Sequence, residues 1–368
     1  MSINNLDSTN SIPSQSNALS ADEKYMQRCI EIAKNGLGTT APNPMVGAVI
    51  VYNDTIIGEG FTSAYGGSHA EVNAINSVKD STLLKNATIY VTLEPCSHYG
   101  KTPPCADLIV KMGIPKVVIG LKDPHEKVAG NGIKKLKAAG CEVNVGVLEQ
   151  ECTEHHKRFL TFFTNKRPYV ILKWAETSDG FIAPDFLIRE EEKKPYWITN
   201  TKSRQLVHKW RSEEPGILVG TNTVLADNPQ LNIRQWTGKA PTRIVLDRNL
   251  RISKDFHVLD GKQKTIVCTQ IADTTKYVKG VSYKILNFES QLPQQLCNLM
   301  FEEQLQSVII EGGSQTLQSF IDADLWDEAR IFRGAAEFQK GIKAPKPTGR
   351  IIKQMEILTD QLTILRND

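Results

Sequence analysis

The order of apolar and polar positions in the first half of the chain predicts strands and helices in alternation. Short apolar or β-branched runs are typical of buried strands, and they occur at residues 45–51, 55–60, 87–93, 116–120 and 142–147. Ser20 and Glu23 have the spacing of a capping box, which opens a helix that ends near Gly36. Further helices are predicted at residues 68–78, after Pro103-Pro104, at 131–139 and at 149–164. Strands that alternate with helices predict an α/β sandwich.

A basic, proline-terminated segment from Asn165 to Pro168 separates this pattern from a second one of the same kind. We therefore expect three parts, which are a disordered tail over residues 1–20, a first domain over 21–166 and a second domain over 167–368. The second domain is predicted to hold strands at 170–173, 216–219, 243–246, 265–268 and 307–310, and helices at 201–211 and 292–303. The charged run at 189–194 predicts a solvated loop.

Length and composition agree with a two-domain globular protein. The chain has 368 residues, which is more than one hydrophobic core usually serves. A formal net charge of +3 is too small to indicate nucleic acid or a membrane surface as the main partner. No run approaches the roughly 18 apolar residues of a membrane span, and the Ser- and Asn-rich start lacks the pattern of a signal peptide. We therefore expect a cytoplasmic protein whose seven cysteines stay reduced.

Four residues of the first domain carry the pattern of a catalytic metal site. His69 begins a predicted helix, Cys96 follows a predicted strand, and Cys105 begins another helix. One His and two Cys suit zinc, with a fourth position left for water. Zinc lowers the pKa of such water to about 7, and Glu71 is placed to carry a proton from it to a leaving nitrogen. We expect one zinc ion per chain, with Glu71 as the catalytic acid and base.

Two features keep other interpretations of this site open. Zinc deaminases have H-x-E followed by P-C-x-x-C, whereas here eight residues separate Cys96 from Cys105. A purely structural zinc would require a fourth protein ligand, for which His98 is the candidate.

At this point the sequence resembles a known family, the bifunctional riboflavin biosynthesis deaminase/reductases. The resemblance rests on residues 41–49, on 69–72, and on 92–105 with their Gly-Lys-Thr-Pro-Pro-Cys ending. The long loop between the cysteines separates this family from the cytidine, guanine and tRNA adenosine deaminases. In the second half the similar segments are 173–180, 197–199, 220–229, 243–247 and 311–313. The resemblance covers roughly residues 21–330.

The resemblance implies both the folds and the reactions. It implies a cytidine-deaminase-like α/β/α sandwich followed by a dihydrofolate-reductase-like α/β domain with a mainly parallel sheet. The first domain would deaminate 2,5-diamino-6-(5-phosphoribosylamino)pyrimidin-4(3H)-one. The second would reduce the ribosyl chain with NADPH to give 5-amino-6-(5-phosphoribitylamino)uracil.

The resemblance also implies residue roles in both domains. The residues that would bind the deaminase substrate are Asn43, His98, Lys101 and Asp123. The residues that would hold NADPH are Glu176 (by a backbone contact), Trp197, Thr223, Asp227, Gly313, Ser314, Gln315, Thr316, Leu317, Gln318 and Ser319. The residues that would hold the sugar phosphate are Arg211, Leu231, Arg234 and Glu311, with Lys173 aiding the reduction at the ribose end.

Several positions depart from the family pattern. His125 stands where the family usually has Asn, and Pro195 where it often has Ser. An insertion lengthens the loop within residues 188–194, and the chain after Arg330 follows the family only loosely. This last segment is expected to complete the second sheet and to form a subunit contact. We thus expect a homo-oligomer, a dimer or a tetramer, formed through the reductase domain.

Three other functions remain open at this stage. The chain could be a deaminase only, with a catalytically impaired reductase-like domain. A nucleic-acid base deaminase would want a basic, aromatic-lined groove, which the net charge of +3 and the 7% aromatic content do not favour. A zinc-stabilised scaffold without activity would lose nothing measurable on replacement of Glu71. From the family resemblance, the expected substrate is a small pyrimidine ribosyl phosphate.

Overall fold

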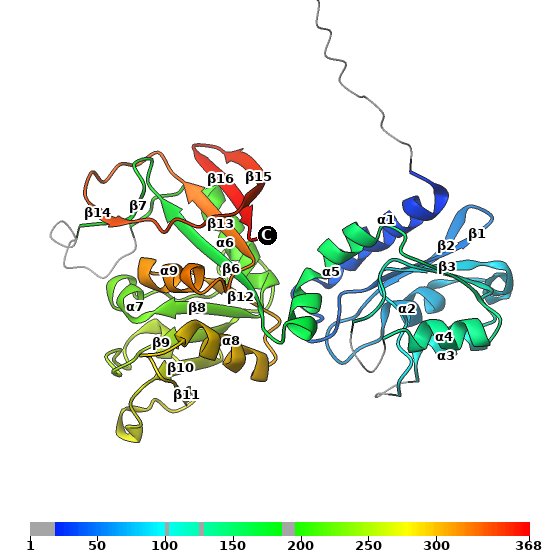
Figure 1. Ribbon diagram of the computed structural model, residues 1–368, viewed down its shortest axis with the longest axis horizontal. Coiled ribbons are helices and arrows are strands. Elements are labelled where there is room, and N and C mark those ends of the chain that lie inside the picture. Colours follow the sequence, from blue (N-terminus) through cyan, green and yellow to red (C-terminus); the bar gives the residue numbers. More distant parts are fainter. Residues whose placement is uncertain (1–18, 100–102, 125–128, 186–195) are drawn as a thin grey trace, which may run out of the picture.

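The computed structural model describes residues 19–99, 103–124, 129–185 and 196–368, which fold around two large β-sheets in two lobes (Figure 1). The chain passes from the first lobe to the second after helix α5, between Thr164 and Tyr169. The predicted α/β architecture is confirmed in both lobes. The expected tail over residues 1–20 lies largely outside the described residues, and Ser20 itself caps the first helix.

The first sheet has five strands in the order β2-β1-β3-β4-β5. Their bounds are β1 (Gly47–Tyr52), β2 (Thr55–Phe61), β3 (Thr88–Val91), β4 (Lys116–Ile119) and β5 (Glu142–Val145). β1 runs antiparallel to β2 and β3, whereas β3, β4 and β5 are parallel. The strand predicted at 87–93 ends earlier, at Val91, and the Glu94 N–H donates to the Leu121 carbonyl oxygen beyond the end of β4.

Helices cover both faces of this sheet (Figure 1). On one face lie α1 (Ala21–Ala33), which continues as η1 (Lys34–Gly36), and α5 (Glu149–Thr164). On the other face lie α2 (Ala70–Ser77), α3 (Cys105–Lys111) and α4 (Asn131–Ala138), while η2 (Ser81–Asn86) leads into β3. The capping box at Ser20 and Glu23 is confirmed, since each side chain accepts the other residue's backbone N–H.

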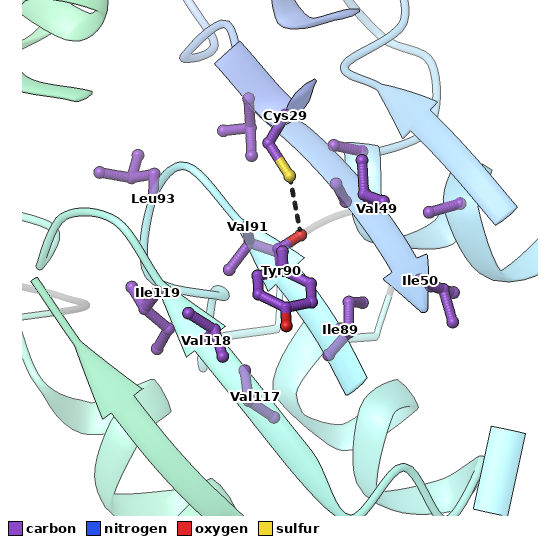
Figure 2. Close-up of a cluster of buried hydrophobic side chains, with 14 of the residues drawn as sticks. Cys29, Val49, Ile50, Ile89, Tyr90, Val91, Leu93, Val117, Val118 and Ile119 are labelled. Carbon is purple, nitrogen blue, oxygen red and sulfur yellow. Dashed lines mark hydrogen bonds between the residues drawn. The ribbon is translucent and has the colours of Figure 1, made fainter. Parts of the chain in front are cut away.

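The core of the first lobe is formed by the central strands and the inner faces of the helices. Figure 2 shows Cys29 of α1 with its Sγ 3.4 Å from the carbonyl oxygen of Tyr90 on β3. Cys29, Cys152, Cys268 and Cys297 are all buried, as expected for small apolar side chains, while Cys141 is half-buried.

The second sheet has nine strands in the order β11-β10-β9-β8-β12-β6-β13-β16-β15. Their bounds are β6 (Tyr169–Glu176), β8 (Gly216–Gly220), β9 (Thr242–Leu246), β10 (Thr265–Thr269), β11 (Ser282–Ile285), β12 (Ser307–Ile310), β13 (Glu328–Arg333), β15 (Arg350–Ile357) and β16 (Asp360–Arg366). All neighbouring strands from β11 to β13 are parallel, and β16 runs antiparallel to both of its neighbours, β13 and β15. The expected mainly parallel sheet is confirmed.

Helices cover this second sheet on both faces as well. The side chains of α6 (Thr201–Glu213) and α7 (Thr221–Asp227) are buried against one face, and those of α8 (Leu292–Glu302) and α9 (Ser314–Asp322) against the other. Short elements complete the lobe, namely η4 (His257–Leu259), η5 (Thr274–Lys276), and the two-stranded pair β7 (Phe181–Pro184) and β14 (Gly341–Lys343).

None of the helices in the described part of the chain combines the length and apolar character needed to cross a membrane. The insertion at 188–194 and Pro195 lie outside the described residues.

Candidate active sites

His69, Cys96 and Cys105 come together at one edge of the first sheet. His69 is the N-cap residue of α2, Cys96 follows β3 and Cys105 is the first residue of α3. The His69 Nδ1 atom lies 3.6 Å from the Cys96 Sγ and 3.3 Å from the Cys105 Sγ. The backbone N–H of Cys105 also donates to the Cys96 Sγ over 3.3 Å, which holds the two cysteines together.

This donor set fits zinc. The three ligand atoms lie within 4.8 Å of one another, and one nitrogen with two sulfurs is the set that zinc prefers. Among the described residues no fourth His, Cys, Asp or Glu joins the group, and His98 is exposed. The arrangement therefore leaves one coordination position for water, as a catalytic zinc site does.

The charges of the two thiols depend on each other. Hydrogen bonding from Cys105, with a contribution from His69, holds the pKa of Cys96 well below its usual range. The same interaction with Cys96, together with burial, holds the pKa of Cys105 well above its usual range. A divalent cation among them would stabilise both thiolates, since a coordinating thiol is deprotonated outright.

Glu71 lies in the first turn of α2, two residues after the His69 ligand, and is only 4% exposed. In the protein alone, burial and the neighbouring Cys96 raise the pKa of Glu71 to about 7. A carboxyl group with a pKa near the working pH can both accept and return a proton.

Two of the four predicted deaminase substrate residues lie near this sheet edge. Asn43 lies on the turn before β1. Because Ala48 near the start of β1 pairs antiparallel with Val91 at the end of β3, this turn lies near the segment that leads from β3 to Cys96. Asp123 is buried and follows β4, which is parallel to β3, at the same edge. His98 is exposed. Lys101, like the variant position His125, lies outside the described residues.

Glu94 organises this edge, and the sequence reasoning missed it. Its buried carboxylate accepts the backbone N–H groups of Asp123, Gly130 and Ile133 at 3.3, 2.9 and 3.2 Å. It thereby ties the segment that carries Asp123 to the residues just before Cys96. A carboxylate at the end of an apolar strand run is the signal that could have found it.

In the second lobe, Arg211 and Glu311 form a partly buried, bidentate ion pair. The Arg211 Nε and Nη2 atoms donate to the Glu311 carboxylate over 2.9 and 2.7 Å. Burial alone would raise the pKa of Glu311, but the charges of Arg211 and Lys173 lower it to about 2. Burial lowers the pKa of Lys173 on β6, against the opposing effect of Glu311. Three residues predicted separately therefore form one charged cluster.

Arg234 and Leu231 lie on the segment beside this cluster. The Arg234 side chain is exposed, and its Nη1 donates to the Asn232 Oδ1 over 2.6 Å. Burial and the charge of Arg211 lower the pKa of Arg234. The Leu231 side chain is buried in the core beneath, with a backbone φ of 52°.

His208 joins this region, and no sequence pattern pointed to it. It is buried on α6, and its Nδ1 accepts the Arg234 backbone N–H over 3.3 Å. The same nitrogen lies 3.1 Å from the Asn232 carbonyl oxygen, and only a protonated Nδ1 could donate to that oxygen. Burial, with the charges of Arg211 and Arg234, lowers the pKa of His208 to about 4, so the ring is neutral at neutral pH. Nδ1 accepts the Arg234 N–H in the tautomer that carries the ring proton on Nε2.

The predicted cofactor residues converge in part. Gly313 is the N-cap residue of α9, and a Cβ there would lie 3.2 Å from the Thr223 Oγ1 of α7. A Cβ on Gly220, at the end of β8, would meet the Thr316 Oγ1 at 2.8 Å. The glycines thus let α7, β8 and α9 approach one another and leave α9 backbone N–H groups at a helix N-terminus, which fits a phosphate-bearing cofactor.

The remaining predicted cofactor residues have other surroundings. Leu317 is fully buried in the core, Gln318 bonds to Asp322, and Ser319 bonds back to the Thr316 carbonyl oxygen. Ser314 bonds to the Lys343 carbonyl oxygen, and Gln315 is the second residue of α9.

Three candidates lie outside the glycine-lined junction. Trp197 is 61% exposed, with the Arg204 guanidinium 4.5 Å above its ring. The carbonyl oxygen of Glu176 accepts the Gly334 N–H, and its carboxylate pairs with Arg333. Asp227 is the last residue of α7.

Together, the folds and sites define a zinc-dependent deaminase of the cytidine deaminase type, joined to a reductase domain. Residues 19–121 match the cytidine and deoxycytidylate deaminase zinc-binding region, and residues 168–335 match the RibD C-terminal domain. The riboflavin biosynthesis protein RibD of Actinobacillus pleuropneumoniae is 40% identical over 346 residues, which cover 92% of this chain and 90% of that protein.

Solved structures extend the similarity to the whole fold. A diaminohydroxyphosphoribosylaminopyrimidine deaminase/5-amino-6-(5-phosphoribosylamino)uracil reductase from Thermotoga maritima aligns with a TM-score of 0.86 at 38% identity, over 95% of this chain and 99% of that one. RibD of Acinetobacter baumannii aligns with a TM-score of 0.85 at 32% identity, over 94% and 98%. The chain belongs to the RibD family, and is a bifunctional deaminase and reductase of riboflavin biosynthesis that uses zinc and NADPH.

Proposed function

We propose that the chain catalyses two successive steps on one small-molecule substrate. The first is hydrolytic deamination of 2,5-diamino-6-(5-phosphoribosylamino)pyrimidin-4(3H)-one. The second is NADPH-dependent reduction of its ribosyl chain, which gives 5-amino-6-(5-phosphoribitylamino)uracil. The observation that carries the proposal is the three-ligand His69, Cys96 and Cys105 cluster with Glu71 buried beside it. The similarity over nearly the whole chain to the Thermotoga enzyme supports the choice of substrate.

In the deaminase step, we assign proton transfer to Glu71. Zinc held by His69, Cys96 and Cys105 supplies, when bound, an activated water at neutral pH. Glu71 takes a proton from the attacking water and returns one to the departing amino group, so that ammonia leaves. Its buried position keeps the carboxyl group near the pKa that this exchange needs.

The other residues of the first site bind the substrate. Asn43 offers an amide to the ring edge, and Lys101 offers its charge to the phosphate. His98 and Asp123 complete the proposed set.

In the reductase step, we assign phosphate recognition to Arg234 and Arg211. Glu311 holds the Arg211 guanidinium in one orientation, and the Arg211 Nη1 donates to the Asn232 carbonyl oxygen over 3.3 Å, on the segment that carries Arg234. Lys173, beside Glu311, binds the ribose end, and the Leu231 segment contributes through its backbone. NADPH, when bound, supplies the hydride.

We place the cofactor phosphates at the junction of Thr223 with Gly313 to Thr316. Glu176, Trp197, Asp227 and residues 317–319 complete the proposed cofactor set.

Two substitutions test the assignment. Glu71→Gln is expected to retain zinc and to reduce ammonia release by about 10²-fold or more, the usual contribution of a positioned acid and base. Arg234→Ala is expected to leave ammonia release unchanged and to weaken NADPH oxidation on the deaminated intermediate. A chain that deaminates but never oxidises NADPH would establish the deaminase-only alternative. Full deamination by the Glu71→Gln protein would refute the role of Glu71.

We also propose the larger organisation of the protein. The deaminase domain spans residues 21–166 and the reductase domain 167–368, in a cytoplasmic homo-oligomer, a dimer or a tetramer. β15 supports an oligomer through the reductase domain, because it is the last strand of its sheet and exposes Ile351, Ile352 and Met355. Light scattering of the intact protein and of an Ile351→Lys variant tests this, since the variant should dissociate.

A further inference from the structure

We propose that Gln306 of the reductase domain is a positioning residue for the deaminase site. It holds the turn that carries Asn43, which we call the entry turn and define as residues 37–45. The inference rests on the proposed function, in which Asn43 contacts the deaminase substrate.

The entry turn lies between the two lobes, at the start of β1. Its first part, residues 37–40, is held by backbone bonds to Lys34 and Gly36 and by the Tyr65 N–H, which donates to the Thr39 carbonyl oxygen. Beyond it the backbone bonds are fewer: the Asn43 N–H donates to the Thr40 carbonyl oxygen over 2.9 Å, and the Val46 N–H contacts the Pro44 carbonyl oxygen at 3.2 Å. Pro42 and Pro44 have no N–H to donate. The position of Asn43 therefore depends on the neighbouring elements that form hydrogen bonds to the turn.

Helix α5 provides the first support. The His155 Nε2 donates to the Met45 carbonyl oxygen over 2.7 Å. The next residue, His156, bonds through its Nε2 to the Thr92 Oγ1 over 3.1 Å, and that oxygen also accepts the Gly47 N–H. α5 thus joins the start of β1 to the chain that leads to Cys96.

The reductase domain provides the second support. The Gln306 Nε2 donates to the Pro42 carbonyl oxygen over 2.7 Å, next to Asn43 itself. Gln306 is 6% exposed, and its carbonyl oxygen accepts the Tyr169 N–H, so its backbone is fixed to the second sheet at the start of β6. The donor therefore cannot follow the turn if the turn shifts.

A backbone contact reinforces the same junction. A Cβ on Gly38, where φ is +81°, would lie 2.1 Å from the Ser212 carbonyl oxygen at the end of α6. The entry turn and the reductase domain thus touch main chain to main chain.

A cavity beside the entry turn means that hydrogen bonds, and not close packing, determine the position of the turn. A small cavity of about 60 Å³ lies between the entry turn, α5 and the residues before β12, and Asn43, His156 and Gln306 are among its lining. The buried His156 Nδ1 on its border has no hydrogen-bond partner among the described residues. Because the turn is not packed tightly here, directed bonds such as Gln306 to Pro42 set its position.

The test compares two substitutions in the full-length protein. Gln306→Met keeps the length and removes the donor, and Gln306→Glu replaces the donor with a carboxylate facing the Pro42 carbonyl oxygen. Losing one such bond corresponds to about a fivefold effect. We expect the KM for deamination to rise about fivefold with Gln306→Met and further with Gln306→Glu. Zinc content, and the KM for reduction of the deaminated intermediate, should stay at the wild-type values.

Arg366→Met is the matched control. Arg366 bonds to Glu154 over 2.7 Å, which also joins the reductase domain to α5 but leaves the entry turn alone. This variant should deaminate as the wild-type protein does. Wild-type KM and kcat for deamination in both Gln306 variants would overturn the inference, as would an equal loss of both activities. Absence of ammonia release from the wild-type protein would instead refute the proposed function.

Discussion

At the scale of single residues, the two sites show different kinds of organisation. The metal cluster is made of residue types whose chemistry identifies them, since His nitrogen and Cys sulfur are the ligands that zinc takes in proteins. The reductase cluster of Lys173, Arg211 and Glu311 consists of ordinary charged residues. Their role emerges only from mutual contact, because each is partly buried and each neutralises another.

His208 offers a test of the second site at this scale. Its neutral Nδ1 accepts the Arg234 N–H and so fixes the segment that presents Arg234. His208→Phe removes the acceptor, and we expect the KM for the deaminated intermediate to rise about tenfold with kcat less affected. His208→Asn places an acceptor near the position of Nδ1 and should restore KM to within about threefold. NADPH oxidation against substrate concentration measures both, and equal KM values in the two variants would contradict the role.

The sequence could predict the zinc ligands and Glu71 because local spacing and residue chemistry define them. It could not identify Glu94, His208 or Gln306. The partners of Glu94 lie up to 39 positions along the chain, and the Pro42 partner of Gln306 lies 264 positions away. Only the folded topology brings such pairs together, and no periodicity in the sequence predicts these contacts.

At the scale of elements, the strands of the second sheet with continuous apolar runs were predicted from the sequence, and its strands β11, β13, β15 and β16 were not. β12 (Ser307–Ile310) was predicted at its observed bounds, because it is buried on both faces between two parallel neighbours. No strand was predicted at β11 (Ser282–Ile285), and β15 (Arg350–Ile357) was expected only as part of the segment after Arg330 that completes the sheet, which it does. Both are end strands that face solvent, so their side chains carry no buried pattern.

Helix α5 connects the two domains by an ion pair that should dominate their joint stability. Arg158 of α5 pairs with the fully buried Glu214, which also accepts the Ser307 hydroxyl and lies 3.6 Å from Arg330. Arg158→Met leaves a buried carboxylate short of one cation, which should cost about 3–5 kcal/mol in the free energy of unfolding.

Urea unfolding of full-length protein measures this cost. Arg366→Met removes a partly exposed pair from the same helix and should cost less than about 1 kcal/mol. If the two variants unfold at the same urea concentration, the buried pair does not contribute the predicted amount to the free energy of unfolding.

At the scale of the whole molecule, the two reactions use separate sites, and each site belongs to a lobe with its own hydrophobic core. The metal ligands lie on helices and a loop of the lobe built on the five-stranded sheet, and the Lys173, Arg211 and Glu311 cluster lies in the lobe built on the nine-stranded sheet. Zinc removal by a chelator should therefore abolish ammonia release while NADPH oxidation on the deaminated intermediate continues. Spectrophotometry with that intermediate checks this, and a parallel loss of both activities would show that the second site depends on the metal.

The central claim is that one protein performs both steps in order. Its most direct test is the mass of the product formed from the diaminopyrimidine ribosyl phosphate, with and without NADPH. Without NADPH we expect a single change, the exchange of one amino group for oxygen. With NADPH we expect a second change, the gain of two hydrogens in the sugar chain. An unchanged substrate mass under both conditions, or a product that never gains hydrogen, would contradict the account.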